Sequence, residues 1–320
     1  RDKGFFYCFG CQAKGDVYDF VMRTQGISFA EALRHLGERA GVEVTPPTPR
    51  DRQRSDAVAI NGLAQEYFQA NLRDETAGAA AREYLKARKI STESIEKFGI
   101  GFAPEGWDGL LRYALNKGHS DQELMAAGLL SENERGRRYD RFRNRLMFPI
   151  RDGLSRIVGF AGRVLDDSLP KYLNTPETET FRKSQLLYGL DLARPEIREK
   201  GEGNVVEGCM DVIPLHQGGS RNPVAALGAT MTADQATLLS RLDVQRLYLA
   251  FDSDSAGQRA VLSGLEQAVG RQFLVRAVEV PHGQDPADAV LDGDPADFLA
   301  VLQEGLSEVE FRFSNVLAKY

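Results

Sequence analysis

The chain has 320 residues, of which 42% are hydrophobic and 27% are charged, and its formal net charge is −6. This composition excludes an intrinsically disordered chain and is typical of a globular protein with one large or two to three ordinary domains. Because it contains no run of about 18 to 20 apolar residues and begins without a methionine or an apolar signal core, we expect a cytoplasmic protein and a fragment of a longer chain.

Charge is divided unevenly along the chain. Residues 1–204 carry 32 Lys and Arg against 30 Asp and Glu, whereas residues 205–320 carry 8 against 16. Within the first part, residues 135–163 hold nine arginines and only two acids. A basic segment beside an acidic one suggests that one region binds a polyanion and the other binds metal ions.

The first 44 residues contain two of the three cysteines, Cys8 and Cys11, as a C-x-x-C pair around a glycine. An odd cysteine count with this spacing favours a reducing compartment and half of a zinc site over a disulfide framework. Tetrahedral zinc needs four ligands, so the pair would bind zinc only if two more were supplied. Apolar residues then recur at helical spacing, and Ser28 with Glu31 reads as a capping box, which predicts two helices.

A segment rich in proline and charge, residues 45–56, is expected to be a linker. The pattern that follows predicts helices at 57–72, 79–89, 91–98, 108–115 and 121–128, and then β-rich stretches at 145–152 and 155–165. Residues 57–200 are therefore expected to form an α+β domain.

From residue 203 onward, short apolar runs alternate with helical ones. The runs NVVEG, NPVAALG, RLYLAFD and FLVRAVEVP are apolar on both faces, and helical segments separate them. Such strands predict a parallel sheet covered on both sides, with functional groups at the carboxyl ends of the strands.

Acidic residues stand at those predicted strand ends. Glu207 follows the first strand, Asp252 and Asp254 follow the third, and Asp285 and Asp288 follow the fourth. Carboxylate oxygens without a histidine suit Mg²⁺ better than zinc, which predicts a divalent-metal site. A single aspartate at such a position can instead be the N-cap of the next helix, but several acids at strand ends favour the metal.

The run RGRRYDRFRNRLMFPIRD interleaves arginines with aromatic residues. Arg141, Arg143 and Arg145 lie among Tyr139, Phe142 and Phe148. Positive side chains neutralise phosphates and aromatic rings stack on unpaired bases, which predicts a grip on single-stranded nucleic acid. The alternative is a solvated charged surface over an aromatic core.

Several of these stretches resemble a known family. EGCMDVIPLHQ, the AALG turn and FDSDSAG resemble the Toprim domain shared by bacterial primases, several topoisomerases and some nucleases. Upstream, YDRFRNRLMFPIRD, GFAGRVL, PKYLNTPET and LYGL are similar to the catalytic core of the bacterial DNA primases, and YCFGCQAKGD is similar to the second half of that family's zinc-binding module. The resemblance covers nearly the whole chain.

The resemblance implies a multidomain fold of α/β and α+β class. The implied parts are a partial zinc-ribbon module at 1–44, the linker at 45–56, a basic α+β subdomain at 57–200, a Toprim domain with a Rossmann-like parallel sheet at 201–300, and the start of a helical subdomain at 301–320. In this family the missing zinc ligands come from a C-x-x-H segment upstream.

The resemblance also implies roles for residues. Glu207 matches the Toprim glutamate, and Asp252 and Asp254 match the D-x-D metal ligands. Further acids of a site for two Mg²⁺ or Mn²⁺ ions match Asp211 and Asp285, with Asp288 as a weaker candidate. Basic positions along the template and nucleotide path match Arg88, Arg163, Lys171 and Lys183.

The chain departs from the family pattern near the predicted metal site. Cys209 replaces a tyrosine, Ser253 a glycine and Ala229 a threonine. The usual D-P-D becomes Asp285-Pro286-Ala287, so Asp285 fits a ligand position better than Asp288.

The expected function is that of a DNA primase core, a nucleotidyltransferase and DNA-directed RNA polymerase of the primosome. It would make short RNA primers from ribonucleoside triphosphates on single-stranded DNA during replication, leaving an RNA–DNA hybrid. We expect a monomeric core at the replication fork in the nucleoid, with no membrane contact, and a replicative helicase bound through a separate C-terminal domain. Two alternatives stay open: a Toprim nuclease or topoisomerase, and a non-catalytic DNA-binding accessory module of replication or recombination.

Overall fold

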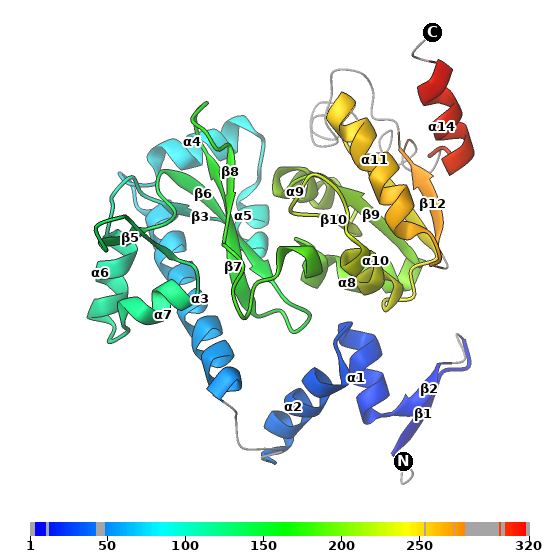
Figure 1. The fold of residues 1–320 in the computed structure, drawn as a ribbon, viewed down its shortest axis with the longest axis horizontal. Helices are drawn as coiled ribbons and strands as arrows, with labels where there is room; N and C mark the ends of the chain where they lie inside the picture. The colour runs from blue at the N-terminus through cyan, green and yellow to red at the C-terminus, as the bar shows by residue number, and fades with distance from the viewer. Residues whose placement is uncertain are drawn as a thin grey trace.

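The computed structural model describes residues 4–10, 13–42, 49–252, 254–271, 273–278, 301 and 305–317. Three parts follow one another along the chain: a small hairpin with two helices, an antiparallel sheet backed by helices, and a parallel sheet between helices (Figure 1). Within these ranges, none of the helices combines the length and the apolar character that crossing a membrane requires.

The first part is an antiparallel hairpin of β1 (Phe5–Tyr7) and β2 (Lys14–Asp16), followed by α1 (Val17–Gln25) and α2 (Phe29–Ala40). Ser28 and Glu31 form the capping box that the sequence predicted for α2. Gly26 ends α1 in the left-handed conformation, with φ of 67°. Glycine reaches this region at little cost, so the chain can turn sharply between the helices.

The second part begins with the long helix α3 (Pro49–Arg73). Residues 49–56, which were expected to lie in a linker, are therefore helical. The shorter helices were all predicted, and they are α4 (Ala79–Ala87), α5 (Thr92–Phe98), α6 (Gly109–Asn116) and α7 (Asp121–Ala126).

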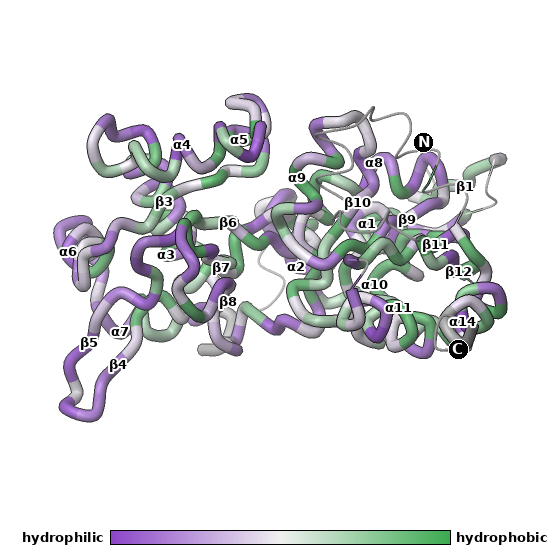
Figure 2. The backbone as a smooth tube through the Cα atoms, turned by 90° about the horizontal axis from the view of Figure 1, so that it is seen from above, coloured by the Kyte–Doolittle hydropathy of each residue, from purple (hydrophilic) through white to green (hydrophobic). Residues whose placement is uncertain are grey.

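Helix α3 packs on an antiparallel sheet with the strand order β3-β6-β7-β8. The strands are β3 (Gly101–Ala103), β6 (Arg145–Arg151), β7 (Ile157–Val164) and β8 (Tyr172–Asn174). The Phe68 ring of α3 meets Phe160 of β7 edge to face, with 5.3 Å between ring centroids. A separate hairpin of β4 (Leu130–Glu132) and β5 (Arg138–Asp140) projects from this part, and its tip is hydrophilic (Figure 2).

The third part is a parallel sheet with the strand order β10-β9-β11-β12. Its strands are β9 (Glu202–Val206), β10 (Pro223–Ala225), β11 (Arg246–Ala250) and β12 (Leu274–Ala277). The 3₁₀ turn η1 (Lys183–Gln185) and α8 (Leu190–Lys200) lead into it, α9 (Cys209–Gln217), α10 (Ala233–Ser240) and α11 (Ser255–Ala268) connect its strands, and α14 (Glu308–Leu317) follows. This is the doubly wound sheet that the sequence predicted.

Successive residues of these strands enter two different cores. Leu247 and Leu249 of β11 pack with α8, α10 and α11, whereas Tyr248 and Ala250 pack with α9. The second core continues into the antiparallel part, because it also contains Phe148 of β6. Burial of a shared apolar surface therefore holds the two sheets together.

Candidate active site

The predicted acids gather where the order of the parallel strands reverses. From β9 the chain crosses to β10 on one side, and it then returns to β11 on the other side of β9. Val206 and Ala250 are register partners at the ends of these neighbouring strands. Glu207 follows the first and Asp252 lies two residues beyond the second, so both reach the switch point at which doubly wound sheets bind ligands.

The carboxylates at this edge affect one another. Although Glu207 is exposed, neighbouring residues displace part of the water around its carboxylate, which raises its pKa above its ordinary value. The carboxylates of Asp252 and Asp254 raise this pKa further. Lys171 acts in the opposite direction and lowers this pKa. Three like charges with one lysine nearby form a site that favours an added cation.

Asp254, and not Asp252, is the N-cap of α11. Its Oδ1 accepts hydrogen bonds from the backbone N–H groups of Ala256, at 2.8 Å, and Gly257, at 2.7 Å. Asp252 is partly buried, and Gly257 in the first turn of α11 packs closely against the backbone of Asp252. The capping interpretation is thus correct for one aspartate of the pair, and the cap holds it beside the other.

Asp211 is directed back toward the start of its own helix. Its buried carboxylate accepts a hydrogen bond from the Gly208 N–H, at 2.8 Å. Beside it, burial raises the pKa of the Cys209 thiol well above its ordinary value, and the Asp211 charge adds to the effect. Cys209 is therefore a small buried side chain whose thiol keeps its proton, which disfavours the thiolate that a nucleophile or a metal ligand needs.

The donor set at the edge fits a hard divalent cation. Glu207 and Asp254 are exposed and Asp252 is partly so, which leaves room for the waters that Mg²⁺ keeps. Over the described part of the chain, no three Asp, Glu, His or Cys side chains converge closely enough to enclose a metal ion. The predicted ligands Asp285 and Asp288 lie outside the described residues.

A basic wall faces the acidic edge from the antiparallel sheet. Arg163 of β7 is buried between the rings of Tyr84 and Tyr172, with its guanidinium carbon 5.5 and 5.4 Å from the two centroids. It also donates a hydrogen bond to the Tyr172 hydroxyl, at 3.2 Å. Arg88 lies over the same Tyr84 ring, at 5.8 Å. The rings hold both guanidinium groups in place, a role for the tyrosines that the sequence analysis missed.

Lys183 reaches the edge from a loop held by a buried glutamine. Its Nζ lies 3.5 Å from the position that a Cβ on Gly228 would occupy, so it sits against the turn after β10. Gln235 is fully buried, and its Nε2 donates hydrogen bonds to the carbonyls of Leu186 and Ala226, both at 2.7 Å, and of Lys183, at 3.3 Å. The T-x-x-Q pattern of a capping box was visible in the sequence, but these long-range bonds were not.

Comparison with known proteins follows the same division of the chain. Three family models match it in order: the CHC2 zinc finger over residues 1–52, the N-terminal domain of the DNA primase catalytic core over 67–194, and a Toprim-like model over 204–290. A DNA primase of Deinococcus radiodurans is 51% identical over 320 residues, which cover 100% of this chain and 55% of that protein. The chain belongs to the bacterial DNA primase family.

Solved primase structures share the fold. A crystal structure of a DNA primase domain from Pseudomonas aeruginosa has a TM-score of 0.77 and 40% identity, covering 82% of this chain and 83% of that one. A structure of the DnaG primase catalytic domain bound to ssDNA has a TM-score of 0.76 and 38% identity, covering 84% of each chain. The chain spans about half the length of the full primases that it matches. These relatives favour the primase interpretation over the nuclease, topoisomerase and accessory-module alternatives.

The arginine segment of this primase-family chain is only partly at the surface. Arg145 is buried, and its Nη1 donates hydrogen bonds to the carbonyls of Pro170, at 2.9 Å, and Gly162, at 3.3 Å. Arg141 is half-buried, and two of its nitrogens donate to the Asn174 carbonyl, both at 3.2 Å. Arg145 therefore uses hydrogen-bond donors to hold the segment before β8, and its contact with nucleic acid stays a prediction.

Arg143 keeps the combination of charge and aromatic surface that the sequence suggested. Its guanidinium lies over Trp107, 4.1 Å from the ring centroid, and also over Tyr139, at 5.1 Å. Trp107 is 57% exposed. The sequence analysis missed this tryptophan, although its position in a loop, as the only tryptophan of the chain, was a signal.

The matched zinc-finger segment carries Cys8 at the end of the β1–β2 hairpin. Cys8 is exposed, and its backbone N–H donates to the Ala13 carbonyl, at 2.8 Å. Cys11 lies outside the described residues. The described half of the predicted pair is thus accessible from solvent.

Proposed function

We propose that the chain is the polymerase core of a DNA primase, which joins ribonucleoside triphosphates into short RNA primers on a single-stranded DNA template. The observation that carries this proposal is the meeting of Glu207 and Asp252 at the switch point of the parallel sheet, with Asp254 and Lys171 beside them. Family membership supports the same reaction, and a similar primase catalytic domain has been solved with ssDNA bound.

Glu207, Asp252 and Asp254 would hold two Mg²⁺ or Mn²⁺ ions, and the repulsion among these carboxylates supports this role because bound cations would relieve it. Asp211, Asp285 and Asp288 remain the proposed further acids of this site. When bound, such ions activate the attacking 3′-hydroxyl and neutralise charge on the leaving pyrophosphate.

The residues of the chain supply positioning and positive charge. Lys171 and Lys183, beside the acidic edge and the Gly228 turn, would bind the phosphates of the incoming nucleotide. Arg88 and Arg163, fixed by tyrosine rings, would bind the template or product backbone. Phosphoryl transfer depends mainly on such positioning.

Arg143 and Trp107 would stack on an unpaired template base, since the ring is exposed and the guanidinium covers part of it. Arg141 and Arg145 would act on the template indirectly, by holding the segments around β8.

The domain division at 1–44, 57–200, 201–300 and 301–320 is proposed on the same grounds, with Cys8 and Cys11 as half of a zinc site completed by two ligands upstream. We further propose a monomeric cytoplasmic core at the replication fork that releases an RNA–DNA hybrid and reaches the helicase through another domain.

The test is incorporation of labelled ribonucleotides on single-stranded DNA with Mg²⁺ or Mn²⁺. Two substrates are compared: a bare template, and a template carrying an annealed short RNA that removes the need for initiation. We expect metal-dependent products with the chain as given, and none with Asp252→Ala. Binding of the template, measured by fluorescence anisotropy, should stay unchanged in this variant.

The matched control is Glu96→Ala, which removes an exposed carboxylate from α5 and should leave synthesis unchanged. Wild-type synthesis by Asp252→Ala would refute the assignment of the site. Binding of the template without product from either substrate would refute the polymerase proposal in favour of a binding module.

A further inference from the structure

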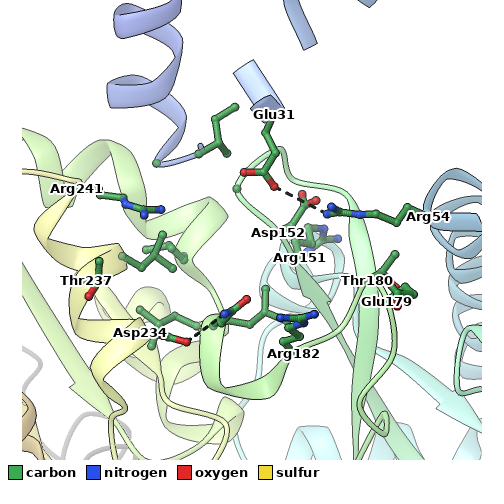
Figure 3. Close-up of a pocket in the computed structure, with 18 of the residues that line it drawn as sticks. Glu31, Arg54, Arg151, Asp152, Glu179, Thr180, Arg182, Asp234, Thr237 and Arg241 are labelled. Atoms are coloured by element: carbon green, nitrogen blue, oxygen red, sulfur yellow. Dashed lines mark hydrogen bonds and ion pairs between the residues drawn. The ribbon is translucent and has the colours of Figure 1, made fainter. Parts of the chain in front are cut away.

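A cleft with a volume of about 560 Å³ lies where the three parts of the chain meet (Figure 3). Its walls come from the α1–α2 corner, the start of α3, the β6–β7 turn, the loop around η1, and α10. None of the candidate active-site residues described above lines it. The cleft is therefore a separate feature of the molecule.

Charged side chains dominate the walls of this cleft. It is lined by five arginines, Arg34, Arg54, Arg151, Arg182 and Arg241, and by four acids, Glu31, Asp152, Glu179 and Asp234. No aromatic side chain is among the lining residues.

The carboxylates of this lining already have partners. Glu31 accepts hydrogen bonds from the Ser28 N–H and hydroxyl in the α2 capping box, at 2.9 and 2.7 Å. Asp152 accepts from the Arg156 guanidinium, at 2.6 and 2.9 Å, and from the N–H groups of its turn. Asp234 accepts from the Gln185 side chain, at 3.1 Å. These three carboxylates are thus already used in hydrogen bonds and ion pairs of the protein itself.

Two arginines, in contrast, have their guanidinium groups available. Arg182 and Arg241 are exposed, and over the described ranges neither side chain makes a hydrogen bond or an ion pair. They lie on opposite walls of the cleft, one on the loop before η1 and one at the end of α10 (Figure 3). Arg54 is 3.9 Å from Glu31 and Arg151 is 3.6 Å from Asp191, so their ion pairs are loose.

We propose that this cleft binds a small anion with several linked phosphates, which bridges the first part of the chain and the two sheets. Guanidinium groups on facing walls suit phosphate oxygens, and the volume is in the range of small-ligand sites. A nucleic-acid strand is the less suitable occupant, because single strands bind largely through base stacking on aromatic rings and this lining has none.

The ligand would also stabilise the contact between the first part and the parallel sheet. That contact contains few polar interactions: Arg194 of α8 donates one hydrogen bond to the Gln25 side chain, at 2.7 Å, and the Arg23 guanidinium lies 4.0 Å from the Asp243 carboxylate. The Gly26 turn packs on Leu238 of α10 and on Leu242, just beyond the end of that helix. An anion held both by Arg34 of α2 and by Arg241 at the end of α10 would favour, by mass action, the arrangement in which the first part lies against the parallel sheet. The proposal does not depend on the polymerase activity proposed above.

The test is a calorimetric titration of the 320-residue chain with inorganic tripolyphosphate in EDTA, which removes divalent cations from the acidic edge. We expect one site, with affinity lowered about tenfold or more in the double variant Arg182→Ala/Arg241→Ala. Both side chains are exposed, so circular dichroism and thermal melting should be unchanged.

A matched variant removes the same charge elsewhere. Arg135→Ala/Arg137→Ala alters the exposed β4–β5 turn and should not weaken binding. Equal weakening in this control, or full affinity in the Arg182/Arg241 variant, would overturn the proposal. Displacement of tripolyphosphate by a short oligodeoxythymidylate would assign the cleft to a DNA strand and would also overturn it.

Discussion

Gly257 lies in the first turn of α11, where a side chain has no room. A Cβ there would lie 2.0 Å from the carbonyl oxygen of Asp252 and 2.8 Å from its carbonyl carbon, whereas real Cβ contacts essentially never fall below 3.0 Å. Because both contacted atoms are backbone, no side-chain rotation relieves the overlap. Gly257→Ala must therefore move the start of α11 and the end of β11 apart by about 1 Å, which is the difference between the 3.0 Å limit and the 2.0 Å contact with the carbonyl oxygen.

The expected signature is a large loss of synthesis with a small loss of stability. A displacement of about 1 Å in a catalytic group can cost about 100-fold in rate, and here Asp252 and Asp254 would both shift. Overpacking costs about 1 to 3 kcal/mol, and alanine regains up to about 1 kcal/mol through its helix propensity. The free energy of unfolding should thus fall by at most about 3 kcal/mol. Primer synthesis and urea unfolding of the same preparations measure both effects.

Gly62→Ala in α3 is the matched control, because a Cβ there meets nothing within 4 Å. This variant should unfold at an equal or higher urea concentration and should synthesise primers at the wild-type rate. Wild-type synthesis by Gly257→Ala would refute the reasoning, since it would mean that the close approach of α11 to Asp252 does not position the carboxylates.

Three further predictions concern other groups. The folded protein holds the Glu207 proton more tightly than the unfolded chain does. The contribution of this residue to the free energy of unfolding is therefore present below about pH 4.5 and is lost as pH rises through its raised pKa. Glu207→Gln should raise the melting temperature of the metal-free protein at pH 7 and reduce the stabilisation by added Mg²⁺. Burial lowers the pKa of His216 from 6.5 to about 4, so stability should fall by up to about 3 kcal/mol as pH drops through that interval, and His216→Gln should lack this fall in urea unfolding. Gln235→Ala leaves three carbonyls without their donor and should lower the free energy of unfolding by about 2 to 4 kcal/mol; an unchanged urea midpoint would contradict this role of the amide.

The sequence by itself determined most of the helices, the strands of the parallel sheet and the edge at which the proposed site lies, but not the helical start of α3 over residues 49–56. These elements follow from local patterns, which are set by residues within a few positions of each other. Examples are the runs of β9 and β11, which are apolar on both faces, the Ser28 capping box, and the helix that starts at Ser255. Acids placed directly after two such strands must meet if the strands are parallel neighbours, so the residue pattern alone is enough to pair Glu207 with Asp252.

Only the tertiary structure decided how the polar side chains are used. The sequence of an arginine run does not show whether its guanidinium groups face solvent or donate to backbone carbonyls. Arg145 is buried because the segment before β8 folds over it. The amide of Gln235 and the walls of the arginine-lined cleft join residues that are far apart in sequence. Such contacts depend on how completed elements pack against one another, and no local pattern of residues carries that information.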